Sequence, residues 1–406
     1  MSNLLKQIEK IPRATYKLID VTSRIGDGLH GTPVYDDNGE YYFINGNNLD
    51  NGYVSIKKDT KKVNESEYIK HKKDLTERTL LLSINGTIGN LAKYKNEKCI
   101  LGKSVSYINI SDGFDLNYFY YVLLDNRFKK HITNNASGST IKNVSLEQLR
   151  DYEINIPNLS IQKKISEILS AYDEKIENNN KIIKNLETTA QTIFNEWFVN
   201  FHFPGYEKVK MIDSEMGKIP EGWEMKKISR LATVTLGGTP SRDKKEFWGG
   251  SIPWINSGEI NNLRIIKATE YISEAGLKKS NASIMNSGTT LLAITGATLG
   301  QVSRLEIEST ANQSVVGIYD ENNILNEYIY LCIKNNILDI ISGASGGAQQ
   351  HINKQLIENY KMLIPLENIT YSFNGTIKPM FNFIKESLLE NQKLKQSRDQ
   401  LLAKLI

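Results

Sequence analysis

The feature that most constrains how this chain can fold is a long amphipathic stretch, residues 160–198, that contains neither proline nor glycine. Its apolar residues recur at alternating spacings of four and three, the pattern of an α-helix that packs against another helix along one seam. Pro157 lies just upstream, and Ser160 is the expected N-cap. At about 1.5 Å per residue, the helix should be roughly 60 Å long. The seam positions are Ile165, Leu169, Tyr172, Ile176, Asn179, Ile183, Leu186, Ala190, Ile193 and Trp197.

A second stretch, residues 369–406, repeats this pattern roughly 208 positions later and is the expected partner of the first helix. At this offset Ile165 matches Phe373, and Ile176 matches Ile384. If the two helices ran parallel, the segment 201–218 would have to return along the whole helix, which an extended chain of about 3.3–3.6 Å per residue could barely do. The helices are therefore predicted to form an antiparallel coiled-coil pair.

The duplication extends to the segments that precede each helix. Gly-Thr-Pro occurs at 31–33 and 238–240, Leu-Leu-x-Ile at 81–84 and 291–294, Ala-Ser-Gly at 136–138 and 344–346, and Ile-Pro at 156–157 and 364–365. Independent motifs that agree on nearly one offset indicate an internal repeat. We predict an α+β fold with two duplicated globular modules, separated by the two long helices and related by pseudo-twofold symmetry. The expected boundaries are 1–157 for the first module, 158–200 for the first helix, 201–218 for a linker, 219–365 for the second module and 366–406 for the second helix.

Composition narrows the class of protein only slightly. The formal net charge is +4, so a nucleic-acid role has to rest on the placement of individual side chains. Cys99 and Cys332 stand alone, which argues against a disulfide framework or a zinc site and fits a reducing compartment. The sequence shows no signal-peptide pattern and no membrane-length apolar run. We therefore expect a soluble, cytoplasmic protein.

Motifs for catalysis do not emerge from the sequence. The segment Gly-Lys-Ser at 102–104 ends like a phosphate-binding loop, but Glu97 stands where the first glycine of that motif is required. The histidines show no metal-ligand spacing, and we find no glycine-rich nucleotide loop or nucleophile elbow. The sequence thus predicts a protein that binds, with no metal site of its own.

Polar side chains gather on three turns at matching places in the two modules. Asn, Gln, Arg, Lys, Ser and Thr are the side chains that contact base edges and phosphates. Because loops are polar in most proteins, solvated turns are the alternative to a nucleic-acid contact. The candidate DNA-binding residues are His30, Thr32, Asn45, Asn47, Ser139, Thr140 and Lys142 in the first module, and Thr239, Ser241, Arg242, Lys244, Asn256, Ser257, Gln349 and Gln350 in the second.

Taken together, these motifs resemble the specificity subunit of type I restriction-modification systems over essentially the whole chain. The resemblance is carried by the paired Ile-Pro, Gly-Thr-Pro and Ala-Ser-Gly motifs, by Trp-Ile-Asn-Ser-Gly at 254–258, and by a helix that closes in Asn-Glu-Trp-Phe at 195–198. Phe-x-Phe-Pro at 201–204 and Gly-x-Ile-Pro-Glu-Gly-Trp at 217–223 are especially similar. Two departures are Phe43 in the place of Trp254, and Thr370 where the first helix has the family's Gln162.

The resemblance implies a non-catalytic subunit whose modules are target recognition domains, each reading one half of a bipartite, asymmetric site in double-stranded DNA. It also implies that the helices set the spacer between the half-sites and dock two methyltransferase subunits. Those subunits would bring S-adenosylmethionine and methylate adenine, and restriction (motor) subunits would bring ATP and Mg²⁺, so the chain itself would hold no cofactor. Three alternatives are a specificity subunit of a related single-complex restriction enzyme, a structural coiled-coil scaffold, and a methyltransferase or nuclease with unrecognised motifs.

Overall fold

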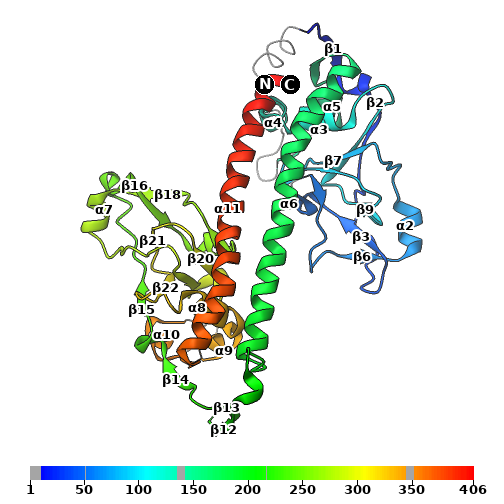
Figure 1. Cartoon of the computed structure of the whole chain (residues 1–406). Helices are drawn as coiled ribbons and strands as arrows, with labels where there is room; N and C mark the ends of the chain where they lie inside the picture. Colours follow the sequence, from blue (N-terminus) through cyan, green and yellow to red (C-terminus); the bar gives the residue numbers. More distant parts are fainter. Residues whose placement is uncertain (1–10, 51, 135–141, 216, 344–351) are drawn as a thin grey trace. The chain divides into compact units, whose positions relative to one another are not determined.

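The computed structural model describes residues 11–50, 52–134, 142–215, 217–343 and 352–406 of the chain (Figure 1). Two compact units make up the chain: residues 1–176 together with 393–406, and residues 177–392. Each unit therefore contains one globular module and parts of both long helices. Within the described residues, no helix is long and apolar enough to cross a membrane.

The first unit is built on antiparallel pairing between segments that are distant in sequence. A two-stranded ribbon closes the module, with Ala14 opposite Ile156. A four-stranded sheet has the order β2-β10-β7-β8, and a three-stranded sheet has the order β6-β3-β9, in which β3 and β9 run parallel. The strands are β1 (Ala14–Lys17), β2 (Thr22–Asp27), β3 (Tyr41–Ile44), β4 (Leu49–Asp50), β5 (Tyr53–Val54), β6 (Lys62–Val63), β7 (Thr79–Ser83), β8 (Leu91–Lys93), β9 (Cys99–Leu101), β10 (Val105–Ile110) and β11 (Glu153–Ile156). The helices are α2 (Glu65–His71), α3 (Leu116–Leu124), α4 (Asn126–Asn134) and α5 (Leu146–Arg150).

The second unit repeats this topology, with β17 as an additional strand at the edge of its larger sheet. Its ribbon joins β14 to β23, its larger sheet has the order β15-β22-β19-β20-β17, and its smaller sheet has the order β18-β16-β21 with β16 and β21 parallel. The strands are β14 (Glu224–Lys227), β15 (Thr233–Leu236), β16 (Trp248–Ile255), β17 (Arg264–Ile265), β18 (Glu270–Ile272), β19 (Thr290–Ala293), β20 (Val302–Leu305), β21 (Thr310–Ala311), β22 (Val315–Tyr319) and β23 (Lys361–Ile364). The helices are α7 (Glu274–Lys278), α8 (Asn326–Asn335), α9 (Ile337–Ser342) and α10 (Lys354–Asn359). The matching strand orders confirm the predicted duplication and the α+β class.

The long helices are α6 (Leu159–Phe198) and α11 (Glu367–Leu405), and both run without interruption. In the first unit, Ile165 of α6 shares a buried cluster with Leu401 of α11. In the second unit, Phe194 near the end of α6 packs against Phe373 near the start of α11, with ring centroids 6.4 Å apart. The start of each helix therefore lies beside the end of the other, as the antiparallel prediction requires.

The structure corrects the predicted N-cap of the first long helix. The side chain of Asn158 accepts a hydrogen bond from the N–H of Ile161 (3.1 Å), while Ser160 already lies inside α6. Asn158 is thus the capping side chain, because an asparagine one residue before the helix reaches the free N–H groups of its first turn. The segment 201–218, predicted as a linker, contributes to a hairpin of β12 (Met211–Ser214) and β13 (Gly217–Pro220).

Candidate functional site

In the first module, two of the predicted polar turns are joined by a third segment. The N–H of Leu29, next to His30, donates to the carbonyl of Leu101 (2.7 Å), and the N–H of Gly102 donates to the carbonyl of Ile44 (2.8 Å), next to Asn45. The chain at 101–102 therefore lies between the His30 turn and the Asn45 turn and brings them together.

The second module repeats this junction with the same pattern of hydrogen bonds. The N–H of Gly238 donates to the carbonyl of Ala311 (2.8 Å), and the N–H of Asn312 donates to the carbonyl of Ile255 (2.9 Å). Thr239 directly follows Gly238, and Asn256 directly follows Ile255. Two modules that differ in most side chains thus keep one backbone arrangement at this place.

The hydrogen bonds also correct the register of the Gly-Thr-Pro match. Gly28 donates its N–H to Val105 as Gly237 does to Val315, so Gly28 is the counterpart of Gly237. Thr32 consequently lies farther along its turn than Thr239 does. The two Gly-Thr-Pro tripeptides have the same sequence, but the first module has extra residues between its strand and its tripeptide.

The joining segment carries two exposed polar side chains that sequence reasoning did not single out. Lys103 in the first module and Gln313 in the second stand at the same place, next to the intermediate Ser104 and Ser314. The side chain of Gln313 accepts a hydrogen bond from Thr239 Oγ1. The sequence offered little signal for this equivalence, because Leu-Gly-Lys-Ser at 101–104 and Ala-Asn-Gln-Ser at 311–314 share only their last serine.

The third predicted turn borders the same junction. Val144 donates its N–H to the carbonyl of Ile84 (2.9 Å), and Ile352 donates to the carbonyl of Ile294 (3.2 Å). Lys142 is exposed, and its carbonyl accepts a hydrogen bond from the N–H of Gly86 (3.3 Å). The predicted residues Ser139, Thr140, Gln349 and Gln350 lie outside the described residues.

Asn45 and Asn256 cap short 3-10 turns. The Asn45 side chain accepts from the Ser104 hydroxyl (2.9 Å), and its N–H donates to Asn48 (3.0 Å). The Asn256 side chain accepts from the N–H of Gly258 (2.8 Å) and donates to Glu259 (3.1 Å). Local hydrogen bonds therefore position the Asn256 amide, whereas the Asn45 amide is held by a residue of the joining segment.

Arg242 lies in a cluster of aromatic and acidic side chains. Its guanidinium group stands 3.6 Å from the ring centroid of Trp248 and 5.0 Å from that of Trp254. Both terminal nitrogens of Arg242 donate to Glu270, at 2.5 and 3.1 Å. These hydrogen bonds lower the pKa of the Glu270 carboxyl below its usual value. Arg242 thus lies over an indole ring, and both of its terminal nitrogens are occupied by one carboxylate.

The remaining predicted residues lie at the surface of the same turns. His30 is paired with Asp27 at 2.5 Å, and the backbone carbonyl of Ser241 accepts from the indole of Trp248 at 3.1 Å. Ser257 is half-buried at the start of its 3-10 turn. Thr32, Asn47 and Lys244 are exposed, as are His30 and Ser241.

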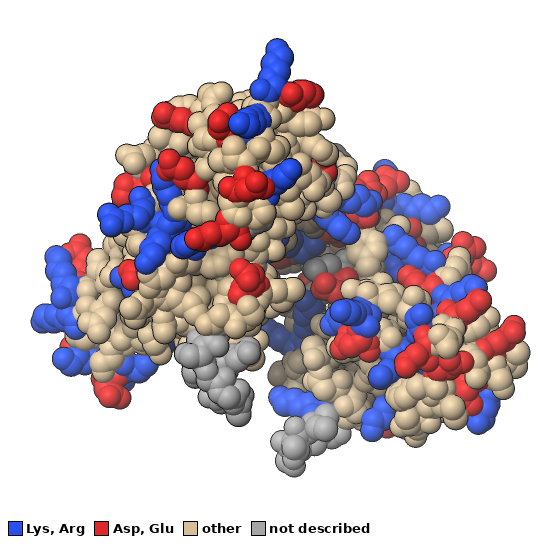
Figure 2. Space-filling model, turned by 90° about the horizontal axis from the view of Figure 1, so that it is seen from below, with Lys and Arg blue, Asp and Glu red and all other residues tan. Residues whose placement is uncertain are grey.

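The surface charge is mixed in sign. On the face drawn in Figure 2, lysine and arginine side chains are interspersed with aspartate and glutamate. Among the described residues, no group of three or more His, Cys, Asp or Glu side chains is arranged to hold a metal ion. The polar side chains at the turns are of the hydrogen-bonding types that contact base edges and phosphates.

Comparison with known proteins identifies a family for both modules. The type I restriction modification DNA specificity domain matches residues 26–188 and again residues 220–396. The MjaIX type I restriction enzyme specificity subunit of Methanocaldococcus jannaschii is 28% identical over 340 residues, which cover 81% of this chain and 76% of that protein. The HindI specificity subunit of Haemophilus influenzae is 25% identical over 354 residues, which cover 71% of this chain and 76% of that protein.

A solved structure supports the fold. The S subunit of a type I restriction-modification system from M. genitalium superposes with a TM-score of 0.59 at 16% sequence identity, covering 98% of this chain and 96% of that one. At this level of identity the likeness concerns the arrangement of the chain, since side chains at the turns are free to differ.

Proposed function

Because this chain belongs to the type I restriction-modification specificity family, we propose that each of its modules, residues 1–157 and 219–365, reads one half of a bipartite, asymmetric DNA site. In this role the chain is the non-catalytic subunit that selects the sequence, and it works in the cytoplasm with the subunits that carry out the chemistry. S-adenosylmethionine, ATP and Mg²⁺ belong to those partners.

The proposal is supported chiefly by the repeated junction of three polar turns. The backbone hydrogen bonds of Leu29 with Leu101 and of Gly238 with Ala311 hold equivalent turns together in the two modules. A fixed backbone that displays exchangeable side chains is what a protein needs to read different bases with one architecture, because base identity is distinguished by hydrogen-bonding groups in the grooves.

Lys103 and Gln313 are the side chains that we assign to this task in addition to the predicted residues. Both are exposed at the centre of the junction. A glutamine that forms two hydrogen bonds with adenine, or a lysine that donates to guanine, contributes about 1–3 kcal/mol of discrimination. Gln313→Ala should therefore relax one half-site only, and Lys103→Ala should affect only the other. Relaxation of both half-sites by either single substitution would contradict independent modules.

We further propose that the helix pair sets the spacer between the half-sites. This is supported by α6, whose 40 residues continue without a break from one unit into the next. Inserting one heptad into each helix, after Ile176 and after Gln392, keeps the seam facing its partner and lengthens the pair by about 10 Å. Since base pairs are stacked about 3.4 Å apart, the spacer should lengthen by about three base pairs.

The insertion experiment has a direct control and a clear failure. Inserting the heptad into α6 alone shifts the seam of only one helix, and the product should not assemble correctly. If the matched double insertion folds and the spacer keeps its original length, the helices do not set the spacer.

We also propose that two methyltransferase subunits dock on the chain, one for each copy of the repeat. This is supported by the duplicated construction, because equivalent surfaces recur on the two halves of a repeat. The mass of the complex, measured over a range of subunit concentrations, should correspond to two methyltransferase subunits per chain. A saturating ratio of one to one would contradict the proposal.

A further inference from the structure

A cluster of five buried charged side chains joins the second module to the helix pair. The cluster consists of Glu187 of α6, Arg264 of β17, Arg304 of β20, Glu306 just after β20, and Glu327 of α8. Each of these side chains is at most 10% exposed. We call this cluster the charge lock, and all of it lies within the second unit.

The hydrogen bonds of the charge lock form a continuous chain. Arg264 donates to Glu187 at 2.6 Å and to Glu306 at 2.7 Å, and Arg304 donates to Glu306 at 2.8 Å and to Glu327 at 3.0 Å. The helix α11 takes part through Phe381, whose ring centroid lies 3.9 Å from the Arg264 guanidinium carbon and 5.2 Å from that of Arg304. Arg264 therefore contacts both long helices, and Arg304 contacts α11.

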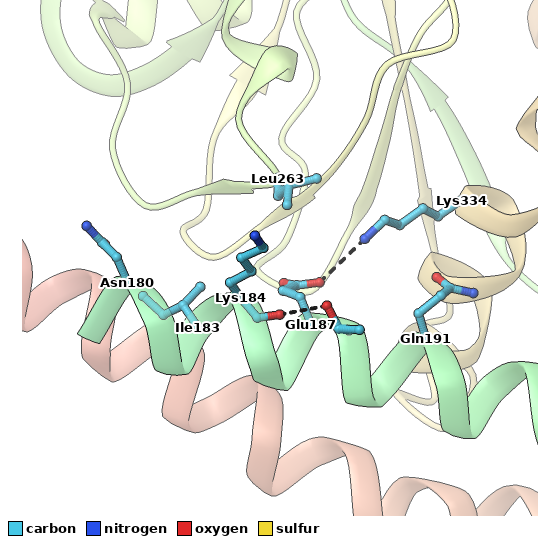
Figure 3. A pocket seen from close by; sticks show the side chains of 8 residues that line it. Asn180, Ile183, Lys184, Glu187, Gln191, Leu263 and Lys334 are labelled. Carbon is cyan, nitrogen blue, oxygen red and sulfur yellow. Dashed lines mark hydrogen bonds and ion pairs between the residues drawn. The ribbon is translucent and has the colours of Figure 1, made fainter. Parts of the chain in front are cut away.

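Apolar packing does not close this part of the interface. A groove of about 400 Å³ runs along α6 beside the lock, and Leu263, next to Arg264, forms part of its wall (Figure 3). Across the groove Lys334 of α8 approaches Glu187 to 3.6 Å. Charged side chains thus bridge the module and the helix where close-packed apolar groups do not.

Among the described residues of the first module, the equivalent positions do not form such a lock. The counterpart of Arg304 is Lys93, which pairs with Leu80 on the neighbouring strand as Arg304 pairs with Thr290. Lys93 donates to the neutral Asn117 at 2.6 Å, where Arg304 meets a carboxylate. The position on α11 that matches Glu187 carries the exposed Lys395.

In the first unit, the carboxylate beside the helix pair is bound by an arginine of the other long helix. Asp173 of α6 accepts hydrogen bonds from Arg398 of α11 at 2.5 Å and from Tyr121 at 2.6 Å. A cation and a carboxylate that bridge the two helices in one unit are thus replaced in the other by arginines of the module. The two interfaces have the same backbone and different charge patterns.

Resting on the proposed function, we propose that the charge lock is a positioning element that fixes the orientation of the second module on the helices and so restricts the complex to one spacer length. Buried ion pairs with several directional hydrogen bonds tolerate only one geometry, whereas apolar surfaces of similar shape can slide. The charge lock therefore contributes more to a single orientation of the second module than to the stability of the fold. Its arginines fit only a helix that presents a carboxylate.

The test uses the full chain in complex with its methyltransferase subunits and a set of DNA duplexes whose spacers differ by single base pairs. The variant is Glu187→Met combined with Arg264→Met, because replacing both members of a buried pair by apolar residues preserves folding far better than removing one. The control is Glu274→Met combined with Lys278→Met, an ion pair of 3.0 Å in the same module that is exposed to solvent.

We expect the double variant to methylate duplexes with a spacer one base pair longer or shorter roughly tenfold faster than the wild-type chain does, with unchanged half-site bases. The control should keep the wild-type preference. A folded double variant with the wild-type spacer preference overturns the proposal. If the double variant does not fold, Glu187→Gln, which keeps the shape of the side chain, takes its place. It should broaden the range of accepted spacers by a smaller amount, and an unchanged spacer preference would again overturn the proposal.

A measurement without DNA separates this proposal from the proposed function. The N–H of Glu306 donates to the carbonyl of Ile265 (2.9 Å), so hydrogen exchange at this amide reports on the seating of β17. Exchange should be faster in the lock variant than in the control. If the wild-type chain directs no methylation but exchange is faster in the lock variant, the proposed function is wrong and the charge lock is still supported. If exchange is the same in the lock variant and the control, the charge lock does not fix the module, whatever the chain binds.

Discussion

Two buried asparagines in the helix seam provide a quantitative test of how the helices are matched. Asn179 donates to Asn391 at 2.9 Å and to Glu390 at 2.7 Å, and Asn391 donates to Asn180 at 2.9 Å. Asn179 and Asn391 are 2% and 5% exposed, whereas Asn180 and Glu390 are exposed to water. Each buried amide therefore has one hydrogen-bond partner in the other buried amide and one at the surface.

Asn179→Leu leaves the carbonyl oxygen of Asn391 buried without its donor, which should lower the free energy of unfolding by about 1–3 kcal/mol. Asn391→Leu should have a similar effect. The double variant places two leucines face to face. The hydrogen-bonding partners that remain, Asn180 and Glu390, are exposed to water, so the double variant should be at least as stable as the wild-type chain. The energetic coupling between the two substitutions should therefore be at least about 2 kcal/mol.

Tryptophan fluorescence can follow this unit alone, because all four tryptophans of the chain lie within residues 177–392. For a slope of about 5 kcal/mol per M in guanidinium chloride, a loss of about 2 kcal/mol shifts the midpoint by about 0.4 M. The single variants should show this shift and the double variant should not. Additive losses in the double variant would refute the idea that the asparagines satisfy each other.

Three further outcomes follow from particular contacts. Arg242→Ala should relax recognition of the second half-site only, which methylation maps can check. Glu270→Gln removes the carboxylate that pairs with Arg242, so it should strengthen DNA binding and make it more dependent on salt, as binding at two salt concentrations can show. Gly238→Ala should destabilise the second unit, because a Cβ atom would lie 2.3 Å from the backbone of Asn281, as fluorescence-monitored unfolding can measure. Burial raises the pKa of the Cys332 thiol to about 12, so the stability it contributes below its unfolded pKa of about 8.5 should decline as pH rises from there toward 12, and Cys332→Ala should flatten the decline.

Much of the architecture could be predicted because the repeated sequence motifs lie in strands and helices. Motifs such as Leu-Leu-x-Ile at 81–84 and 291–294 recur at nearly one offset, and they form the matching central strands β7 and β19. The seam of α6 was predictable because helical periodicity is a local property, and none of its predicted positions is exposed.

The junction of the turns was only partly predictable. The sequence indicated the turns at Asn45 and Asn256, but the segments 101–104 and 311–314 that join them make their contacts with residues far away along the chain. The register of the first turn was predicted wrongly for the same reason, because Gly28 is identified as the counterpart of Gly237 by hydrogen bonds and not by the neighbouring tripeptide.

The charge lock could not be predicted from the sequence. Glu187 occupies a position between seam residues of α6, where charged side chains normally face water. It is buried because Arg264, remote in sequence, covers it with a guanidinium group. A buried charge is tolerated only with its partner in place, and the partner is supplied by the tertiary fold.

The central claim, that this chain selects a bipartite site, is tested most directly by mapping methylated adenines in the genome of cells that carry the chain and its methyltransferase subunit. The account predicts methylation at an asymmetric motif of two short half-sites separated by one fixed spacer, and loss of that methylation when the chain is removed. Methylation at a continuous motif, or methylation that persists without the chain, would contradict it.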